Sequence, residues 1–250
     1  MKILITNDDG YQAEGVNILF NMLKKDNDVF IFAPDRERSG SSHCLTLHQP
    51  LRIKEISNNI FAVTGMPTDC ILIALNGFLK GMDIDIILSG INHGPNLGED
   101  IFYSGTVAGA FEGMMRNKSG IAISVASFGK VDFSGVRDYL PGILQKLYPI
   151  IKDNRFILNI NFPNIPSRQI KGIRITKLGT RRYDDVIVKK KDPRGNDYYW
   201  IGGHKPLWEN ENGTDYMAIS NNYISITPLK IDITDYKSIN IFEKEFNIEL

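Results

Sequence analysis

Apolar and polar residues alternate in blocks along the first two-thirds of the chain. Residues 2–6 form a short, nearly continuous apolar run, which is typical of a strand covered on both faces. Residues 14–25 then carry an apolar residue at every third or fourth position, which predicts an amphipathic helix. Residues 29–33 are again apolar and end at a proline. This order of strand, helix and strand predicts a βαβ unit with a parallel sheet.

The same alternation continues to about residue 165. We expect further helices over residues 67–79, 106–116 and 136–150. We expect further strands over residues 84–88, 121–126 and 156–160. Residues 1–165 are therefore predicted to form a doubly wound α/β domain.

The pattern changes over residues 166–250. Short β segments, separated by polar and basic loops, are predicted at residues 173–177, 186–188, 198–201 and 223–226. Residues 186–201 are typical of a hairpin that turns at residues 192–195, and residues 241–250 are typical of a terminal helix. A hairpin of this kind has little core of its own. We therefore predict a β-rich extension that needs a partner subunit.

The composition limits which partners and which cellular compartment we expect for the protein. The 250 residues include 29 basic and 29 acidic side chains, so the formal net charge is zero. That balance argues against broad non-specific binding to nucleic acid or to an anionic membrane. No signal peptide is visible, and no apolar stretch approaches the roughly 18 residues of a membrane helix. Cys44 and Cys70 form no disulfide framework and are expected in the interior, which fits a cytoplasmic protein.

The sequence NDDG at residues 7–10 follows the first predicted strand. The carboxyl edge of an open α/β sheet is where ligands bind. Asp8 and Asp9 would repel each other there unless a cation lay between them, and carboxylate oxygens suit Mg²⁺, Mn²⁺ or Ca²⁺. Gly10 permits the bend that would let both reach one ion. A solvated turn is the alternative interpretation of this acidic pair.

Three further polar stretches should lie at the same edge, at residues 35–43, 89–100 and 103–110. The first two offer serine and asparagine oxygens. The third opens a helix, whose free N–H groups favour a phosphate. A flexible polar loop or an ordinary serine N-cap would explain each stretch alone. No P-loop lysine follows Gly105 and no GxGxxG follows the first strand, so nucleotide-dependent kinases and NAD enzymes are poorly supported.

His43 is the one histidine in these stretches with a candidate role. It could act as a general acid or bind the phosphate. A structural histidine with satisfied hydrogen bonds is an equally good interpretation.

Four separated motifs, in order, carry a resemblance to a known family. They are ITNDDG at residues 5–10, APDRERSG at 33–40, SGIN at 89–92 and YSGTVAGA at 103–110. Together with SITPL at residues 225–229, they resemble the SurE family, the stationary-phase survival proteins. The resemblance implies a metal-dependent phosphatase of nucleoside 5′-monophosphates, often also of 3′-monophosphates and sometimes of short polyphosphate. It also implies a Rossmann-like domain whose β-rich extension builds a homodimer or homotetramer.

The resemblance also assigns roles to residues. One divalent cation per subunit, Mg²⁺ or Mn²⁺, would be held by Asp8, Asp9, Ser39 and Asn92. The phosphate would contact Asn96, Ser104, Gly105 and Thr106. Chemical reasoning adds a catalytic role for Asp8 and Asp9: one of them could accept the proton of the attacking water, or a carboxylate could attack the phosphate directly.

Two positions depart from the family pattern. Met66 precedes Pro67 where the family usually has threonine, and Asn222 stands where glycine is usual. Asparagine tolerates a positive φ, so the second change is compatible with the same backbone. Neither residue is one of the expected metal ligands.

Two other classes of protein also carry acids after the first strand. A receiver-like signalling module binds Mg²⁺ without turnover but needs an aspartate after a third strand, near residues 52–54, where this chain has none. A haloacid-dehalogenase-type phosphatase needs Asp-x-Asp, and this chain has Asp-Asp-Gly. We keep the signalling module as the alternative.

Overall fold

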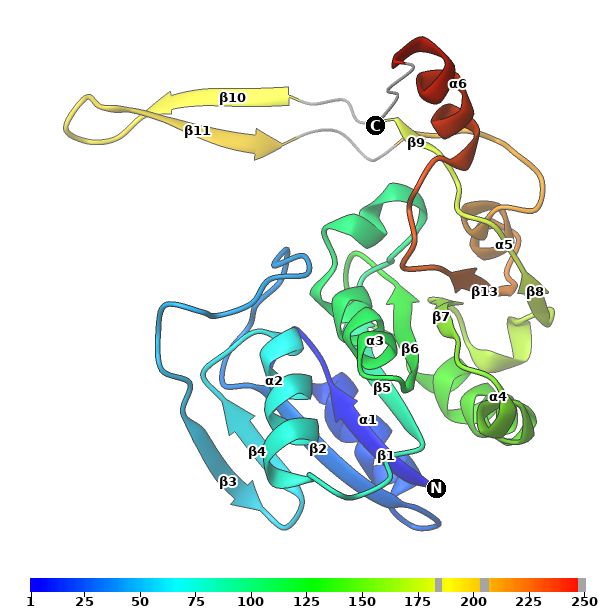
Figure 1. Ribbon diagram of the computed structural model, residues 1–250. Coiled ribbons are helices and arrows are strands. Elements are labelled where there is room, and N and C mark those ends of the chain that lie inside the picture. The colour runs from blue at the N-terminus through cyan, green and yellow to red at the C-terminus, as the bar shows by residue number, and fades with distance from the viewer. Residues whose placement is uncertain (183–185, 203–206, 247–250) are drawn as a thin grey trace.

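A mostly parallel sheet forms the centre of the molecule (Figure 1). The computed structural model describes residues 1–182, 186–202 and 207–246. Within them, the main sheet has nine strands in the order β3-β4-β2-β1-β5-β6-β7-β13-β8. These strands are β1 Lys2–Thr6, β2 Asp28–Pro34, β3 Ile53–Ser57, β4 Ile60–Val63, β5 Ile86–His93, β6 Ser119–Ala126, β7 Ile157–Pro163, β8 Ile173–Ile175 and β13 Ile224–Leu229.

The strands from β4 to β7 are parallel to one another. Only the outer pairs β3–β4 and β7–β13 are antiparallel in the described sheet. Helices connect β1 to β2, β4 to β5, β5 to β6 and β6 to β7, and each returns the chain to the same end of the sheet, as a parallel pairing requires. The predicted α/β fold with a doubly wound, mostly parallel sheet is confirmed.

Helices cover both faces of the sheet. The described helices are α1 Glu14–Leu23, α2 Pro67–Ile73, α3 Gly105–Met115, α4 Ser134–Asp153, α5 Asp215–Ser220 and α6 Tyr236–Phe246, with short helical segments η1 Ala74–Phe78, η2 Gly98–Phe102 and η3 Ser167–Gln169. On one face, residues of α1 and α4 belong to the same buried apolar cluster as Ile3 and Ile5. On the other, α2 packs on Leu4. Successive residues of β1 thus point to opposite faces, and both faces are buried, as its apolar sequence predicts.

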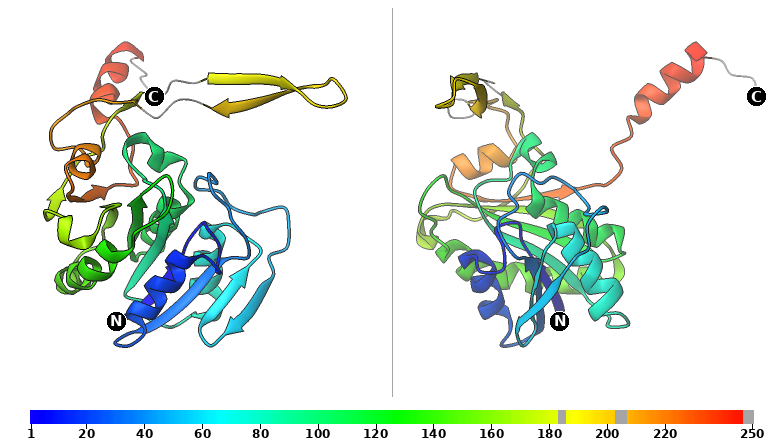
Figure 2. Two further views of the ribbon diagram at one scale, coloured as in Figure 1. Left: turned by 180° about the vertical axis from the view of Figure 1, so that it is seen from behind. Right: turned by 90° about the vertical axis from the view of Figure 1, so that its left-hand side faces the viewer.

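The C-terminal residues extend away from this core. The strands β10 Val186–Lys191 and β11 Asp197–Gly202 form a hairpin that reaches out from the body (Figure 1). The helix α6 also projects from the body (Figure 2). A second small pair, β9 Arg181–Arg182 and β12 Leu207–Trp208, lies between the hairpin and the sheet. No described helix is long and apolar enough to cross a membrane.

Several sequence predictions need adjustment. The terminal helix begins at Tyr236 rather than at residue 241, and residues 247–250 of that prediction lie outside the described residues. The prediction that both cysteines are interior is correct for Cys70 but wrong for Cys44, which is exposed on the polar loop after β2. The strands β3 and β4 and the helix α5 were not expected. Their sequences are short and partly exposed, so they carry little periodic signal.

Candidate active site

The polar loops after β1 and β2 and before α3 meet at the carboxyl edge of the sheet. The strands β1 and β5 are parallel neighbours, with Thr6 beside Ser89 at their carboxyl ends. The N–H of Arg38 donates to the carbonyl oxygen of Asp8 at 2.7 Å, which joins the first loop to the second. The N–H of Ser42 donates to the carbonyl of Tyr103 at 3.1 Å. Backbone hydrogen bonds therefore hold loops that are distant in sequence at one place.

A cavity of about 660 Å³ opens at this edge. It falls within the size range of about 300–1,000 Å³ of small-molecule sites. Five of the residues predicted from the sequence line it: Asp8, Ser39, Asn92, Asn96 and Ser104. The structure thus brings together most of the candidate metal and phosphate contacts.

Asp8 lies at the bottom of the site and is only 4% exposed. Burial raises the pKa of its carboxyl group because the charged form loses its water, and the hydrogen bond from Thr106 offsets part of that rise. The Thr106 hydroxyl donates directly to Asp8 Oδ1. Thr106 therefore fixes the orientation of Asp8 rather than facing the cavity itself.

Asp9 has an oxygen that is left without a donor. Its Oδ2 is buried and has no hydrogen-bond partner within the described part of the chain. Burial, and then the charge of Asp8, raise the pKa of Asp9 to about 6, while His93 lowers it somewhat. A buried carboxylate next to a partly buried one is an arrangement that a bound divalent cation would stabilise.

The other side chains that could ligate a cation at this site are uncharged. Among the described residues, no three His, Cys, Asp or Glu side chains gather at one point, so a cation here needs other oxygens. Ser39 supplies a hydroxyl, which in this structure donates to Glu37 Oε1 at 2.8 Å. The Asn92 amide nitrogen donates to the carbonyl of Gly94 at 3.1 Å, so its Oδ1 is the atom left for a ligand. This all-oxygen set suits Mg²⁺ or Mn²⁺.

The helix α3 begins directly against Asp8. Ser104 is its N-cap, and its hydroxyl accepts from the N–H of Val107 at 3.0 Å. A Cβ placed on Gly105 would lie 2.9 Å from Asp8 Cβ and 2.6 Å from Ser41 Oγ, so only glycine allows this approach. The free N–H groups of the first turn and the positive end of the helix dipole favour an anion beside the carboxylates.

Ser41 is a candidate that the sequence analysis did not single out. Its hydroxyl oxygen is buried and finds no hydrogen-bond partner in the residues that the structure describes. Its position beside Gly105 puts this oxygen at the start of α3. A buried hydroxyl without a partner costs free energy unless a ligand satisfies it.

Asn96 is held by a buried polar network that was also missed. The Asn96 N–H donates to Asn161 Oδ1 at 2.9 Å, and its side-chain amide donates to Ser124 Oγ at 2.8 Å. Its carbonyl oxygen accepts from the side chains of Asn159 at 2.7 Å and Asn161 at 2.9 Å. The signal was two asparagines two positions apart in an otherwise apolar strand, β7. They fix the loop that carries Asn96 over the sheet.

His43 lies apart from this cavity. Its Nε2 is 3.0 Å from Glu112 Oε2, and Glu112 Oε1 accepts from Arg116 Nε at 2.8 Å. His43 lines a second cavity of about 400 Å³. Ser104 lines both cavities, but the structure does not bring His43 beside the carboxylates. His93, to which the sequence analysis gave no role, lines the first cavity instead; it directly follows Asn92.

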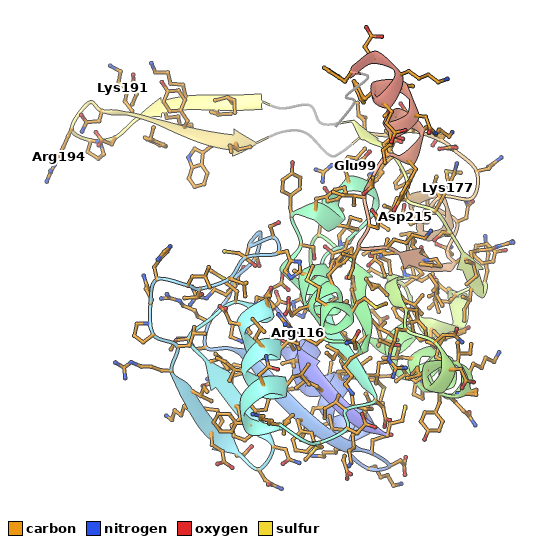
Figure 3. All side chains as sticks on the ribbon, viewed as in Figure 1. Glu99, Arg116, Lys177, Lys191, Arg194 and Asp215 are labelled. Carbon is orange, nitrogen blue, oxygen red and sulfur yellow. The ribbon has the colours of Figure 1, made fainter. Side chains whose placement is uncertain are left out.

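The side of the first cavity contributed by later parts of the chain is aromatic. Phe128, Trp208 and Tyr216 line it, together with Ile219 and Arg181. Arg181 pairs with Asp100, and its N–H donates to Glu99 Oε2 at 2.8 Å. Figure 3 shows Glu99 and Asp215 on the side of the body from which the hairpin extends. Isolated aromatic residues have no periodicity, so no sequence pattern selects them.

Known proteins resemble this chain along most of its length. A family model described as survival protein SurE matches residues 3–185. A relative from Histophilus somni, strain 2336, named 5′-nucleotidase SurE, is 46% identical over 245 residues and covers 98% of each chain. A protein of the same name from Mannheimia succiniciproducens is 44% identical over 243 residues, covering 97% of this chain and 98% of its own. The crystal structure of the SurE protein from Aquifex aeolicus matches with a TM-score of 0.85 at 37% identity, covering 98% of this chain and 100% of that one.

Proposed function

This chain belongs to the SurE family, and we propose that it is a 5′-nucleotidase that uses a divalent metal ion to hydrolyse nucleoside 5′-monophosphates. Relatives that cover nearly the whole chain carry that name. The observation that supports it most strongly is the pairing of Asp8 and Asp9, with one buried oxygen free, at the start of α3. Such a site favours a cation and a phosphate side by side.

Asp8, Asp9, Ser39 and Asn92 would hold the cation, Mg²⁺ or Mn²⁺. When bound, it supplies Lewis-acid polarisation of a phosphoryl oxygen and lowers the pKa of a water. The hydrogen bond from Thr106 orients Asp8 for this role. No sulfur or imidazole ligand is needed, since hard oxygens satisfy these ions.

The residues around the cation would hold the phosphate. The N–H groups of the first turn of α3 that the Ser104 hydroxyl leaves free would bind its oxygens and stabilise the charge that develops in the transition state. Asn96 and Ser104 line the same cavity and would complete the phosphate contacts. The buried network holds the Asn96 backbone through Asn161 and Asn159 and its side chain through Ser124 before the substrate arrives.

The reaction forms a bond from phosphorus to a water oxygen and breaks the bond from phosphorus to the nucleoside oxygen. The water must lose a proton, and the nucleoside oxygen must gain one. We propose that Asp9 accepts the proton of the water. Its Oδ2 has no hydrogen-bond donor among the described residues, whereas Asp8 Oδ1 already accepts a hydrogen bond from Thr106. The proton then reaches the leaving oxygen through water in the cavity.

The test is phosphate release from nucleoside 5′-monophosphates after chelator treatment and again after Mg²⁺ or Mn²⁺ is restored. We expect activity to disappear with the chelator and to return with metal. A panel of 3′-monophosphates and short polyphosphate in the same assay tests whether the activity extends to them, as we also propose.

The opposite result would favour the signalling module. Folded protein that binds Mg²⁺ but releases no phosphate from any substrate would overturn the nucleotidase proposal. The fold gives this alternative little support. The segment where such a module needs its aspartate is β3, an edge strand that runs antiparallel to β4.

We further propose that residues 166–250 form an extension that assembles a homodimer or homotetramer in the cytoplasm. The hairpin extends from the body, with Lys191 and Arg194 at its far end (Figure 3). Exposed apolar side chains on α6, including Phe242 and Phe246, have little to pack on within one chain. Light scattering of the full chain and of a chain ending after β13 tests this, with a smaller assembly expected for the shorter chain.

A further inference from the structure

The cavity has two walls of different chemistry. The polar wall consists of Asp8, Ser39, Asn92, Asn96 and Ser104, and the aromatic wall consists of Phe128, Trp208 and Tyr216. The polar wall is sufficient for a cation and a phosphate. The aromatic wall needs a different explanation, because its rings offer a phosphate no charge or dipole to bind, and a hard divalent cation prefers the oxygen ligands of the polar wall.

Phe128 is exposed but held in position. It lies between β6 and α4, and 84% of its surface is accessible, so it contributes little to the core. Asn164 fixes the turn that carries it, since its side-chain amide donates to Ser127 Oγ at 2.9 Å and to the carbonyl of Lys130 at 3.0 Å. A single exposed phenylalanine is common. One that is presented by a fixed turn at the rim of the active-site cavity is poised to contact a ligand.

Trp208 and Tyr216 form the rest of the aromatic wall. Their rings stack with centroids 4.8 Å apart and planes 9° apart. Trp208 also packs against Gly98, where an added Cβ would lie 2.8 Å from Trp208 Cζ3. The two rings come from β12 and α5, and their mutual stacking fixes them before any ligand binds.

Asp215 connects the aromatic wall to the loop that carries Asn96. Its Oδ2 accepts from the N–H of Gly98 at 2.9 Å, and its Oδ1 accepts from the N–H of Gly179 at 2.8 Å and of Tyr216 at 2.8 Å. Gly98 is two residues after Asn96 of the polar wall. The spacing between the two walls is therefore set by a buried side chain and not by flexible loops.

From this arrangement we propose that the aromatic wall is a nucleobase subsite, in which Phe128 and Trp208 contact the base of the substrate while the polar wall holds its phosphate. The proposal rests on the proposed nucleotidase function and adds the residues that select nucleotides over simpler phosphate esters. Aromatic rings stack on any nucleobase, since every base has a π-face. The subsite therefore predicts a strong preference for a base and a weak preference among bases.

The experiment compares substrates with and without a base. The full chain, with metal restored, is assayed with AMP, UMP and ribose 5-phosphate, and adenosine binding is measured by calorimetry. For Phe128→Ala we expect the KM for AMP and UMP to rise about tenfold, which corresponds to the loss of one base–aromatic stack. The kcat and the KM for ribose 5-phosphate should stay within about twofold of wild type, because the phosphate contacts are intact.

Two matched variants complete the test. Phe128→Tyr keeps a ring and should retain the wild-type KM for AMP. Phe102→Ala removes another exposed phenylalanine, 58% accessible, which lines the second cavity instead, and should leave all three substrates unchanged. Since Phe128 is so exposed, its replacement should not alter folding, which circular dichroism would verify.

An equal rise in KM for AMP and ribose 5-phosphate, or no rise for either, would overturn the nucleobase subsite while leaving the nucleotidase function standing. Wild-type protein that is inactive on every substrate would overturn the proposed function. Calorimetry then still decides the subsite: adenosine binding that weakens in Phe128→Ala supports it, and adenosine binding that is unchanged or absent in wild type refutes it.

Discussion

The polar and aromatic walls of the cavity differ in what they require of the fold. The polar wall buries Asp8 beside Asp9, which raises the pKa of both and makes the metal-free protein less stable than it could be. The aromatic wall stacks Trp208 on Tyr216 at no such cost. The difference supports the proposal that the polar wall serves the chemistry and the aromatic wall serves recognition. Changes to the polar wall should therefore mainly lower kcat, and changes to the aromatic wall should mainly raise KM.

The largest effect is expected from Asp8→Asn. Loss of one carboxylate from the cation site should lower kcat by about a thousandfold. The metal-free variant should unfold at the same or a higher temperature than wild type, because a buried charge is removed and Thr106 can still donate to the amide oxygen. Phosphate release and thermal unfolding, measured on the same samples, check both parts. A variant that loses activity only because it unfolds would contradict the view that Asp8 serves catalysis rather than stability.

Gly105→Ala should have the next largest effect. The new Cβ would approach Ser41 Oγ and Asp8 at under 3 Å, so the start of α3 must move away from the carboxylates. We expect about a hundredfold loss in kcat/KM with AMP and ribose 5-phosphate alike, since the phosphate contacts are displaced. Gly142→Ala is the control. This helical glycine has nothing within 4 Å of the added Cβ, and activity should be unchanged.

Asp215→Asn tests the connection between the walls. Asparagine replaces one acceptor oxygen with an N–H donor that faces backbone N–H groups, so we expect the free energy of unfolding to fall by about 1–3 kcal/mol. The KM for AMP should rise more than that for ribose 5-phosphate. Asp83→Asn is the control, because its exposed ion pair with Lys118 should contribute at most about 1 kcal/mol. Similar losses of stability in both variants would show that the hydrogen bonds of Asp215 do not hold the two walls together.

Ser41→Ala should have the smallest effect. The hydroxyl has no hydrogen-bond partner in the described chain, so we expect the ligand-free variant to be as stable as wild type or slightly more stable. We expect kcat/KM to fall about tenfold, as one hydrogen bond to the phosphate is lost. Thr68→Val removes another buried hydroxyl that lacks a partner there, in α2 and away from the cavity. It should leave kcat/KM at the wild-type value. Equal kinetics in both variants would exclude Ser41 from the site.

The sequence pattern predicts the polar stretches that form the polar wall, and the family resemblance selects Ser39, Asn92 and Asn96 within them. The aromatic wall could not be predicted. Asp8 and Asn92 follow or end apolar runs that reveal buried strands, and parallel strands bring such residues to one edge. A serine and a glycine at the start of a predicted helix indicated a phosphate site at α3. Each of these signals is local, so the chain's pattern carries them directly.

The features that were missed depend on contacts between distant residues. Phe128, Trp208 and Tyr216 come from a turn, an edge strand and a short helix, and only the folded chain brings them together. The position of His43 is decided by Glu112, which is 69 residues away. Neither relation leaves a periodic signal in the sequence.

A crystal structure with Mn²⁺ and a non-hydrolysable nucleoside 5′-phosphonate tests the central claim most directly. The anomalous signal of manganese should lie between Asp8 and Asp9, the phosphonate at the start of α3, and the base against Phe128 and Trp208. Manganese at another place, or a base directed into the second cavity beside His43, would contradict the division of the site into a polar and an aromatic wall.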